Sequence, residues 1–486
     1  MSLSNILKSF FEVEKRGTNL KVEVIAGITT FLSMAYILFV NPTILTDGFS
    51  IALHQALGIS MSSPLPEQYQ GLLYSVRLGF TAATAISAAV ATLIMALYAK
   101  LPFALAPGMG ENAFIAYTII PLFADLILSA QKAVGVEAAQ LAISLALISV
   151  LFNGILFLIF SVGKIREFII NSVPESLKLG IGIGIGLFIT LIGFADVGIV
   201  KGGVATPVTF NTSALTSYPF YLGMLSFVVA AVLLARKVIG GFIIAILAST
   251  IAAGLLGLIS APQNLLMVPV LSTSILNDLP RSFYLYLSLF GIGFPIAFSL
   301  FLVDFFDGIG TITALATKAN LVQNGRIVGI NRALITDAFS SILAPFFGTS
   351  TVVVYVESAS GIEQGGRTGL TALVTSLLFF ASIALTPLFT VIPSYATGGV
   401  LMLVGLLFLS LAGNLTKLED YSELVPAFVT ITSIPFTYSI TTGIGLGFIT
   451  YTLIKLLTGK FKDLKPGVIV ITLLFVLYFI LSAKGF

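Results

Sequence analysis

Long apolar runs, separated by short polar or Gly/Pro-rich stretches, follow one another along almost the whole chain. A helix that crosses a bilayer needs about 17 to 25 mostly apolar residues. The first half carries such runs at 22–40, 76–98, 136–160, 174–195, 217–235 and 240–258, and the second half at 285–306, 332–347, 368–389, 395–412, 424–440 and 441–457. With two interrupted apolar segments, at 101–120 and 349–361, the pattern predicts an all-α polytopic membrane protein with about fourteen crossings.

Basic residues in the loops predict the orientation of these helices, because loops rich in Lys and Arg stay in the cytoplasm. Ahead of the first run stand Lys8, Lys15, Arg16 and Lys21. With residues 1–21 inside, the loops expected inside contain Lys164 with Arg166, Arg236 with Lys237, and Lys318 with Arg326. The loops expected outside, at 41–75 and 389–395, contain no Lys or Arg. We therefore expect a cytoplasmic N-terminus.

The second half of the chain repeats features of the first. Pro174 and Pro393 each open an apolar run, and at equal offsets Gly180 matches Gly399 and Gly186 matches Gly405. Half of about fourteen crossings is an odd number, so the two halves lie in opposite orientations, which is the inverted-repeat plan of many secondary transporters. Chance similarity among Gly-rich apolar helices is the alternative. The glycines from 180 to 186 are expected to permit close helix packing.

One apolar run exceeds this plan. Residues 468–483 follow the basic cluster that ends at Lys465, so we expect 466–486 to form an extra C-terminal apolar helix. The pattern leaves open whether that helix spans the membrane or lies in its interface.

Composition agrees with a membrane protein and excludes several kinds of site. With 57% hydrophobic and 9% charged residues and a mean hydropathy of +1.08, the chain has no room for a separate soluble domain. The net charge of +3 is small and scattered, which argues against nucleic-acid binding. No cysteine and a single histidine, His54 in the polar loop 41–75, exclude disulfides, three-histidine zinc sites and serine–histidine triads. We expect neither an enzyme nor a metal site.

Two carboxylates lie inside one apolar segment, FSLFLVDFFDGIGT at 298–311. Asp304 and Asp307 are three residues apart, so both face the same side of a helix. Each charge near a membrane-helix centre costs about 2.5 to 3.5 kcal/mol, and such residues are functional-site candidates by default. The alternative is a pair capped by Ser or Thr of neighbouring helices near the membrane edge.

The two interrupted segments point to the same pocket. GTSTVVVYVESASG, at 348–361, has a β-branched run that favours an extended strand before Glu357. LPFALAPGMGENAFIAY, at 101–117, is broken by Pro and Gly and restarts at Glu111 and Asn112. Broken segments in corresponding positions of two repeats indicate a transporter binding site. Alternatively, Glu357 lies at the surface of a re-entrant loop and Glu111 only caps the restarted helix.

Four motifs resemble the nucleobase:cation symporter-2 family, specifically the AzgA-type purine permeases: AGITTFLSMAYILFVNP, PGMGENAFIAY, VDFFDGIGT and GTSTVVVYVESASGIEQGGRTGLTA. The resemblance implies two inverted repeats of seven segments, divided into a core and a gate domain, with a short strand in the third and tenth segments. It also implies proton-coupled uptake of adenine, guanine or hypoxanthine across the cell membrane, without a cofactor. Sodium as the coupling ion is not excluded.

On that plan the chain divides into six parts. They are the cytoplasmic N-terminus 1–21, the core halves 22–160 and 285–390, the gate halves 161–260 and 391–458, and the extra helix 466–486.

The resemblance also implies roles for the site residues. Carried over by position, Asp304 and Glu357 contact the purine, Asn112 shapes the site, and Asp307 serves coupling or gating. The remaining expected residues are Val356 and Phe114 for substrate and Glu111 for coupling. The sequence does not rank the three purines, and it leaves open a homodimer formed through the gate half.

Two other functions agree less well with these residues. An anion transporter of the same fold, for sulfate or bicarbonate, needs positive groups at its site, and three carboxylates repel such a ligand. An intramembrane aspartyl protease needs two aspartates that share a proton across a scissile bond, whereas Asp304 and Asp307 share one helix.

Overall fold

Helices form nearly all of the molecule. The computed structural model describes residues 3–483 except 62, 162–172, 203–207, 261, 263–265, 267–272, 324–325, 410 and 416. Within this part of the chain, 11 helical segments are long and apolar enough to cross a membrane, from Leu20–Leu57 to Pro466–Ala483. The prediction of an all-α polytopic membrane protein is confirmed. Lys164 and Arg166 lie outside the described residues.

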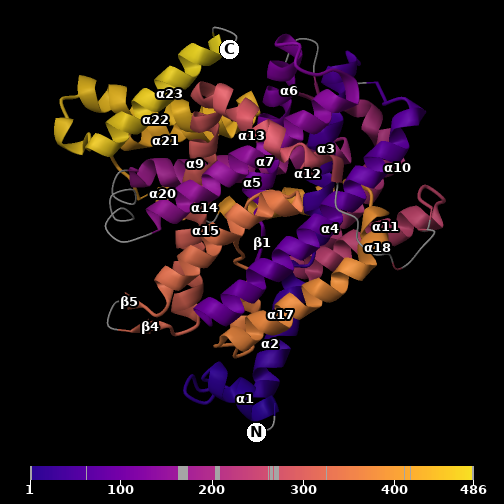
Figure 1. The fold of residues 1–486 in the computed structure, drawn as a ribbon, viewed down its shortest axis with the longest axis vertical. Coiled ribbons are helices and arrows are strands. Elements are labelled where there is room, and N and C mark those ends of the chain that lie inside the picture. Colours follow the sequence, from indigo (N-terminus) through magenta and orange to yellow (C-terminus); the bar gives the residue numbers. More distant parts are fainter. Residues whose placement is uncertain are drawn as a thin grey trace.

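The larger of two layers contains helices from both halves of the chain (Figure 1). From the first half come α2 (Leu20–Met34), α3 (Ile37–Leu57), α4 (Gln70–Ile94), α5 (Met109–Phe114), α6 (Ile120–Ser129) and α7 (Gly135–Phe160). From the second half come α12 (Thr273–Asn277), α13 (Leu279–Ser288), α14 (Phe290–Lys318), α15 (Ile330–Phe347), α16 (Ser358–Glu363), α17 (Gly369–Ser382) and α18 (Thr386–Thr390). We call this set the large layer.

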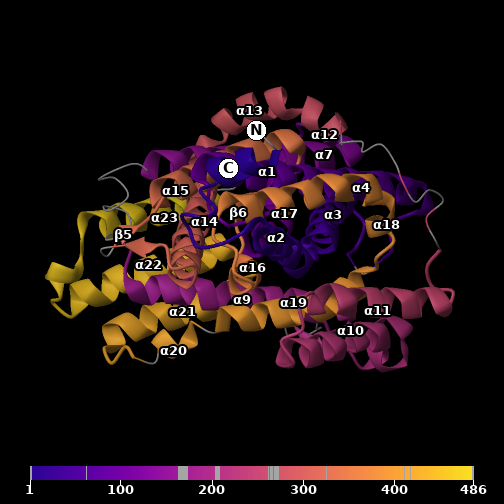
Figure 2. The same ribbon diagram turned by 90° about the horizontal axis from the view of Figure 1, so that it is seen from below.

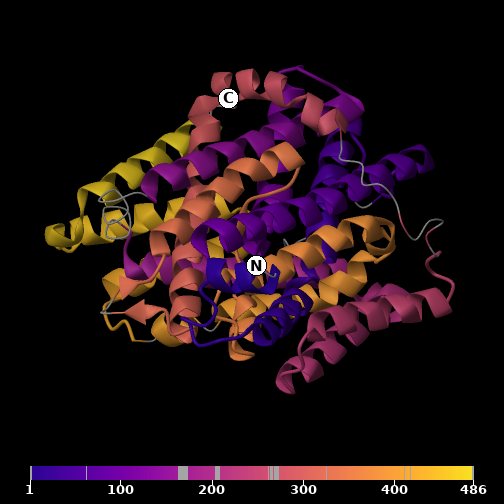
Figure 3. The ribbon, with the colours of Figure 1, turned by 60° about the horizontal axis from the view of Figure 1, so that its bottom comes forward.

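A second layer of helices lies beneath the first (Figure 2). This small layer contains α9 (Glu175–Val197), α10 (Tyr218–Ala235), α11 (Gly241–Leu255), α19 (Ser394–Leu409), α20 (Ala412–Leu415) and α21 (Tyr421–Thr437). The pair α10 and α11 projects at one edge of the molecule (Figure 3). On the other side α22 (Ile440–Leu457) and α23 (Pro466–Ala483) both contact α14. An apolar helix is therefore present at the predicted C-terminal position, over its described residues.

Glycines bring α9 and α19 into close contact. A Cβ added at Gly186 would lie 2.8 Å from the backbone oxygen of Gly405 and 2.6 Å from the Cβ of Phe408. A Cβ at Gly184 would lie 2.7 Å from Ile434 of α21. The prediction that these glycines permit close packing is confirmed. Gly186 and Gly405, which occupy matching positions in the two halves of the sequence, are in contact between α9 and α19.

The two interrupted segments meet as a two-stranded antiparallel sheet at the centre of the molecule. Strand β1 (Leu105–Pro107) pairs with β6 (Val352–Val354), with Ala106 opposite Val353. The hydroxyl of Thr92 serves the edge of β1, accepting from the Leu105 N–H at 2.9 Å and lying 3.0 Å from the Leu105 oxygen. The extended backbone is thus satisfied by protein groups, as membrane depth requires. Two further short hairpins are β2 (Val200–Lys201) with β3 (Thr209–Phe210) and β4 (Val322–Gln323) with β5 (Arg326–Ile327).

The expected polar loop at 41–75 is wrong for most of its length. After a break near Ala35 the chain continues as α3 to Leu57, where Gly58, in the left-handed region at φ +64°, ends the helix. His54 is therefore helical and buried, with its Nδ1 2.8 Å from the Ser50 oxygen and its Nε2 3.1 Å from the Ser63 oxygen. The apolar pattern did not predict this helix because polar residues interrupt it. Those polar side chains are tolerated because they are buried against protein and not exposed to lipid.

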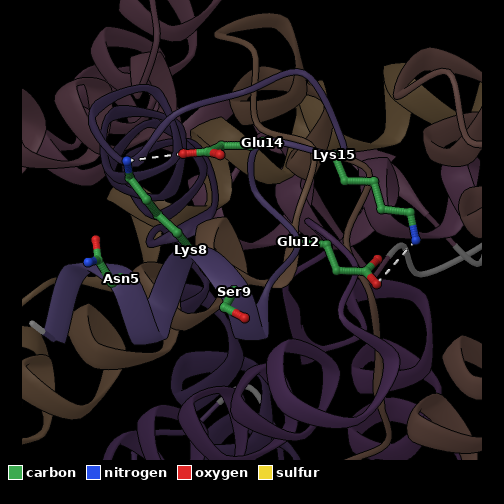
Figure 4. A pocket seen from close by; sticks show the side chains of 6 residues that line it. All are labelled: Asn5, Lys8, Ser9, Glu12, Glu14 and Lys15. Atoms are coloured by element: carbon green, nitrogen blue, oxygen red, sulfur yellow. Dashed lines mark hydrogen bonds and ion pairs between the residues drawn. The ribbon is translucent and has the colours of Figure 1, made fainter. Parts of the chain in front are cut away.

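The N-terminal arm marks one end of the molecule. Helix α1 (Leu3–Phe10) borders a shallow polar hollow, drawn in Figure 4 with the side chains of Asn5, Lys8, Ser9, Glu12, Glu14 and Lys15. Its two ion pairs, Lys8–Glu14 at 3.2 Å and Lys15–Glu12 at 3.3 Å, are exposed and contribute little stability. Arg16 donates to the backbone oxygens of Lys100 (3.1 Å) and Arg367 (3.2 Å), which fixes the arm against the ends of α4 and α16.

Candidate functional site

A cavity of about 560 Å³ lies between the two layers. The large layer lines it with α5, α14 and the segment from β6 to Glu357, and the small layer lines it with α9 and α19. Glu175 and Lys178, at the start of α9, belong to the wall, and the Glu175 side chain is 69% exposed. The cavity therefore reaches solvent at the end of α9 that faces the end of α14.

Glu357 comes directly after β6, where the sheet ends and α16 begins. Its Oε1 accepts a hydrogen bond of 2.7 Å from the hydroxyl of Tyr36, which stands at the break between α2 and α3. Both residues line the cavity, and so does Val356, whose side chain is 49% exposed. The broken segment thus presents a carboxylate with one oxygen held by a neighbouring helix.

The two aspartates of α14 differ in their surroundings. Asp307 lines the cavity, close enough to Glu357 for their charges to interact. Asp304 is fully buried one turn earlier and is not part of the wall. Its Oδ2 accepts hydrogen bonds from Asn153 (2.7 Å) and Ser341 (3.1 Å), while its Oδ1 has no partner in the described part of the chain.

The segment after β1 contributes Met109, Gly110 and Glu111 to the wall, and two further expected residues lie behind it. Glu111, at the start of α5, lines the cavity and lies in electrostatic reach of Asp307 and Asp304. Asn112 is buried beside it and accepts a hydrogen bond from Ser350 of the other interrupted segment. Phe114 packs in the apolar core, away from the wall. Four of the seven expected residues therefore line the cavity: Glu111, Asp307, Val356 and Glu357.

Sequence reasoning missed a fifth carboxylate of this group, the fully buried Asp337 of α15. It interacts electrostatically with Asp304, Asp307 and Glu111, and a Val354 N–H approaches it without the geometry of a hydrogen bond. The argument from insertion cost that singled out Asp304 applies equally to Asp337, which lies inside the apolar run 332–347. Tyr36 carried no comparable signal, because a tyrosine in an apolar run is ordinary.

These five carboxylates form no ion pair with Lys or Arg within the part of the chain that the structure describes. Among the same residues, no group of three has the geometry to hold a metal ion. Several like charges in a poorly solvated site cannot all persist, so the group must share protons or meet hydrogen-bond donors of a ligand.

Membrane helices in two layers, with buried carboxylates around a cavity where two broken segments meet, are the arrangement of a membrane transporter. Comparison with known proteins gives the family. The sequence model of the xanthine/uracil permease family, described as "Permease family", matches residues 69–446. The chain belongs to this family, as the resemblance to nucleobase:cation symporter-2 proteins predicted, and it is a transporter and not an enzyme.

Relatives and solved structures agree with that family. Adenine permease AdeP of Escherichia coli is 36% identical, over 97% of this chain and 95% of its own. Guanine/hypoxanthine permease PbuG of Bacillus subtilis is 35% identical, over 98% of this chain and 99% of its own. The transmembrane domain of the cyanobacterium bicarbonate transporter BicA has a TM-score of 0.55 at 14% identity, covering 88% of this chain and 97% of that one, which shows a shared fold.

Proposed function

We propose that this permease takes up adenine, guanine or hypoxanthine, coupled to protons, by alternating access between its two layers. The observation that carries the proposal is the cavity wall, in which Glu357, Asp307 and Glu111 surround a space between layers. Relatives named as adenine and guanine/hypoxanthine permeases support the substrate class. The volume, about 560 Å³, lies within the usual range for small-molecule sites, roughly 300 to 1,000 Å³.

Glu357 is the residue we assign to purine contact. A purine presents adjacent N–H donors, which a carboxylate accepts in a charge-assisted, geometrically selective pair. Tyr36 holds one oxygen of Glu357 and thereby fixes the plane of the group. Val356 supplies an apolar wall beside it.

The resemblance assigns Asp304 to the purine and Asp307 to coupling, and the cavity supports the opposite division. Asp307 lies on the wall, whereas Asp304 is buried behind it with Asn153 and Ser341 on one oxygen. We therefore infer that Asp307 meets the substrate and that Asp304 carries the coupling proton together with Glu111. Asn112, held by Ser350, shapes the floor between the two interrupted segments.

We also infer that the large layer is the core domain and the small layer the gate domain of a fourteen-segment inverted repeat. The pairing of β1 with β6 and the packing of α9 on α19, each joining one element per half, support this division. The proposed boundaries are 22–160 and 285–390 for the core and 161–260 and 391–458 for the gate. On these boundaries α12 and most of α13 lie outside the core, and α22 is added to the gate. The apolar outer face of α10 and α11 is where a second copy would dock in a homodimer.

We propose that the N-terminus is cytoplasmic, because basic residues gather on its side of the helices. The cavity opens at the same end, where Lys318 of α14 pairs with Glu363 of α16 at 2.5 Å beside the N-terminal arm. The conformation described is then open to the cytoplasm.

Purine binding tests the proposed site directly. Purified protein should bind radiolabelled adenine, guanine or hypoxanthine, and Glu357→Gln should weaken that binding at least tenfold because an amide cannot accept paired N–H donors. The matched control is Glu137→Gln, an exposed glutamate whose partner is Arg281 on the surface. Binding of none of the three bases by the unmodified protein would refute the substrate, and equal binding by Glu357→Gln would refute the site.

An anion transporter is the second candidate, since the fold is shared with a bicarbonate transporter. The cavity wall disfavours it, because four carboxylates (Glu111, Glu175, Asp307 and Glu357) and only one lysine, Lys178, line the cavity. Bicarbonate and sulfate are expected not to compete with bound purine.

A further inference from the structure

A second polar cluster lies at the boundary between the layers and shares no residue with the cavity wall. From the large layer it contains Asp47 of α3, Arg77 of α4 and Tyr117 and Thr118 of the π-helical segment Ile115–Ile119. From the small layer it contains Asp196 of α9, Tyr438 after α21, and the backbone oxygen of Ile392 before α19. We call these residues the distal cluster.

The distal cluster stands at the end opposite to the cavity mouth. Helix α9 connects the two places, with Lys178 on the cavity wall and Asp196 in the cluster. The 18 residues between them correspond to about 27 Å along an α-helix. Glu175, at the open end, is 69% exposed, whereas one carboxylate oxygen of Asp196 is buried and has no hydrogen-bond partner among the described residues.

Hydrogen bonds in the cluster join one layer to the other. Thr118 donates to the backbone oxygen of Tyr438 at 2.8 Å, and Arg77 donates to the backbone oxygen of Ile392. Arg77 is itself anchored in the large layer, where it donates to Thr43 at 2.8 Å. These contacts use the backbone just after α21 and just before α19, so they hold helix ends of the small layer.

Tyrosine and phenylalanine rings close the space beside these bonds. Tyr117 donates to Asp47 at 3.0 Å and meets Phe188 of α9 edge-on, with ring centroids 6.5 Å apart. Phe188 meets Tyr438 edge-on at 5.7 Å. Asp47 and Asp196 repel each other across the boundary, and Arg77 offsets the charge of Asp47.

Tyr438 has a strained backbone. Its φ of +51° lies in the left-handed region, which is disfavoured for a bulky residue and persists only where surrounding contacts hold it. The Thr118 hydrogen bond is one such contact.

We propose that the distal cluster is the outer gate: it closes the boundary while the cavity is open at the N-terminal end, and it separates when the cavity opens at the opposite end. The inference rests on alternating access in the proposed function. Few hydrogen bonds join the layers at the distal cluster. Water can satisfy these polar groups when the layers separate.

The chain has no cysteine, so a single introduced cysteine reports access without background. Val404→Cys is a suitable reporter, because Val404 lines the cavity and is 2% exposed. Reporter protein in liposomes is treated with a membrane-impermeant maleimide from the side opposite to the N-terminus. That side is assigned with Glu14→Cys, in the exposed N-terminal arm.

The gate variants are Thr118→Val, which removes the hydroxyl that donates to the Tyr438 oxygen, and Arg77→Gln, which removes the guanidinium that donates to the Ile392 oxygen. We expect each to speed labelling of the reporter from the opposite side at least threefold. The control is Tyr286→Phe, which removes a buried hydroxyl bonded to Gly293 within the large layer and should leave the rate unchanged. Unchanged labelling in both gate variants, or an equal increase in the control, would overturn the outer gate.

Labelling does not require purine transport, so the two proposals fail separately. Faster labelling in a protein that binds no purine supports the gate and refutes the substrate. Folding of each variant is checked by its melting temperature in detergent, and Thr118→Val, the smaller change, carries the test if Arg77→Gln unfolds.

Discussion

The Glu357 carboxylate accepts a hydrogen bond from Tyr36 and also lines the cavity. Tyr36 occupies one oxygen at 2.7 Å, so the group enters the binding site already oriented. Preorganisation of this kind lowers the entropy lost when a ligand binds. The neighbouring carboxylates, Asp307 and Glu111, form no ion pair with a Lys or Arg among the described residues.

Tyr36→Phe tests that anchor. A hydrogen bond to a charged group contributes about 1.5 to 3 kcal/mol, so we expect the KM for purine uptake to rise about tenfold or more while the protein folds normally. Tyr221→Phe is the control, because the Tyr221 hydroxyl bonds Leu215 on the exposed surface. An unchanged KM in Tyr36→Phe would show that the tyrosine does not position Glu357.

Asp420 sets a second expectation, at the start of α21 and outside the membrane-spanning segments. Hydrogen bonds from Lys460, and then from the Ser422 side chain and backbone, hold the pKa of this carboxyl well below its usual range. A depressed pKa in the folded state stabilises the protein above the unfolded value, about 3.9, and that contribution is lost as pH falls.

Asp420→Ala is therefore expected to lower the melting temperature at neutral pH. The difference from the unmodified protein should shrink as pH falls below about 4, where the unfolded carboxyl is protonated. The check is a melting curve in detergent at several pH values, with exposed Glu419→Ala as control. A difference that stays constant down to low pH would contradict the charge-dependent role.

At the scale of elements, contact between α9 and α19 depends on the absence of side chains. Gly186 faces the Gly405 oxygen at a distance that leaves no room for a methyl group. Overpacking of this kind costs about 1 to 3 kcal/mol.

Gly186→Ala is expected to lower the melting temperature by several degrees. Gly71→Ala, where an added Cβ meets nothing within 4 Å, is the matched control and should be neutral or slightly stabilising. Equal melting temperatures for both variants would mean that the helices can move apart without cost.

Elements were largely predictable from the sequence, and their exceptions have a physical cause. Most long apolar runs predicted helix positions within a few residues, and the β-branched run before Glu357 predicted β6, whereas α14 ends at Lys318, twelve residues beyond the run predicted at 285–306. Most of helix α3 was missed because polar residues such as Asn41 interrupt its apolar sequence. In the fold these polar groups are paired with other helices, as Asn41 is with Thr84 at 2.8 Å.

The site was predictable only in part. The cost of placing a charge in the membrane identified Asp304, Asp307 and Glu357 as candidate functional residues. That cost does not show which of them line the cavity. Burial of Asp304 behind Asn153, and the arrival of Asp337 and Tyr36 from other helices, depend on packing between segments far apart in the chain.

At the scale of the whole molecule, the two layers face each other across a cavity with carboxylates at its centre and a polar cluster at its far end. The central claim is that this arrangement moves purines across the membrane. The large layer holds both interrupted segments, so substrate and coupling groups are fixed to one body while α9 and α19 form the opposite wall.

Uptake of radiolabelled adenine, guanine and hypoxanthine into proteoliposomes, with proton and sodium gradients imposed separately, tests this claim most directly. We predict that at least one base accumulates, that a proton gradient drives it, and that Glu357→Gln abolishes it while Glu137→Gln does not. Absence of uptake of every base by the unmodified protein under both gradients would contradict purine transport.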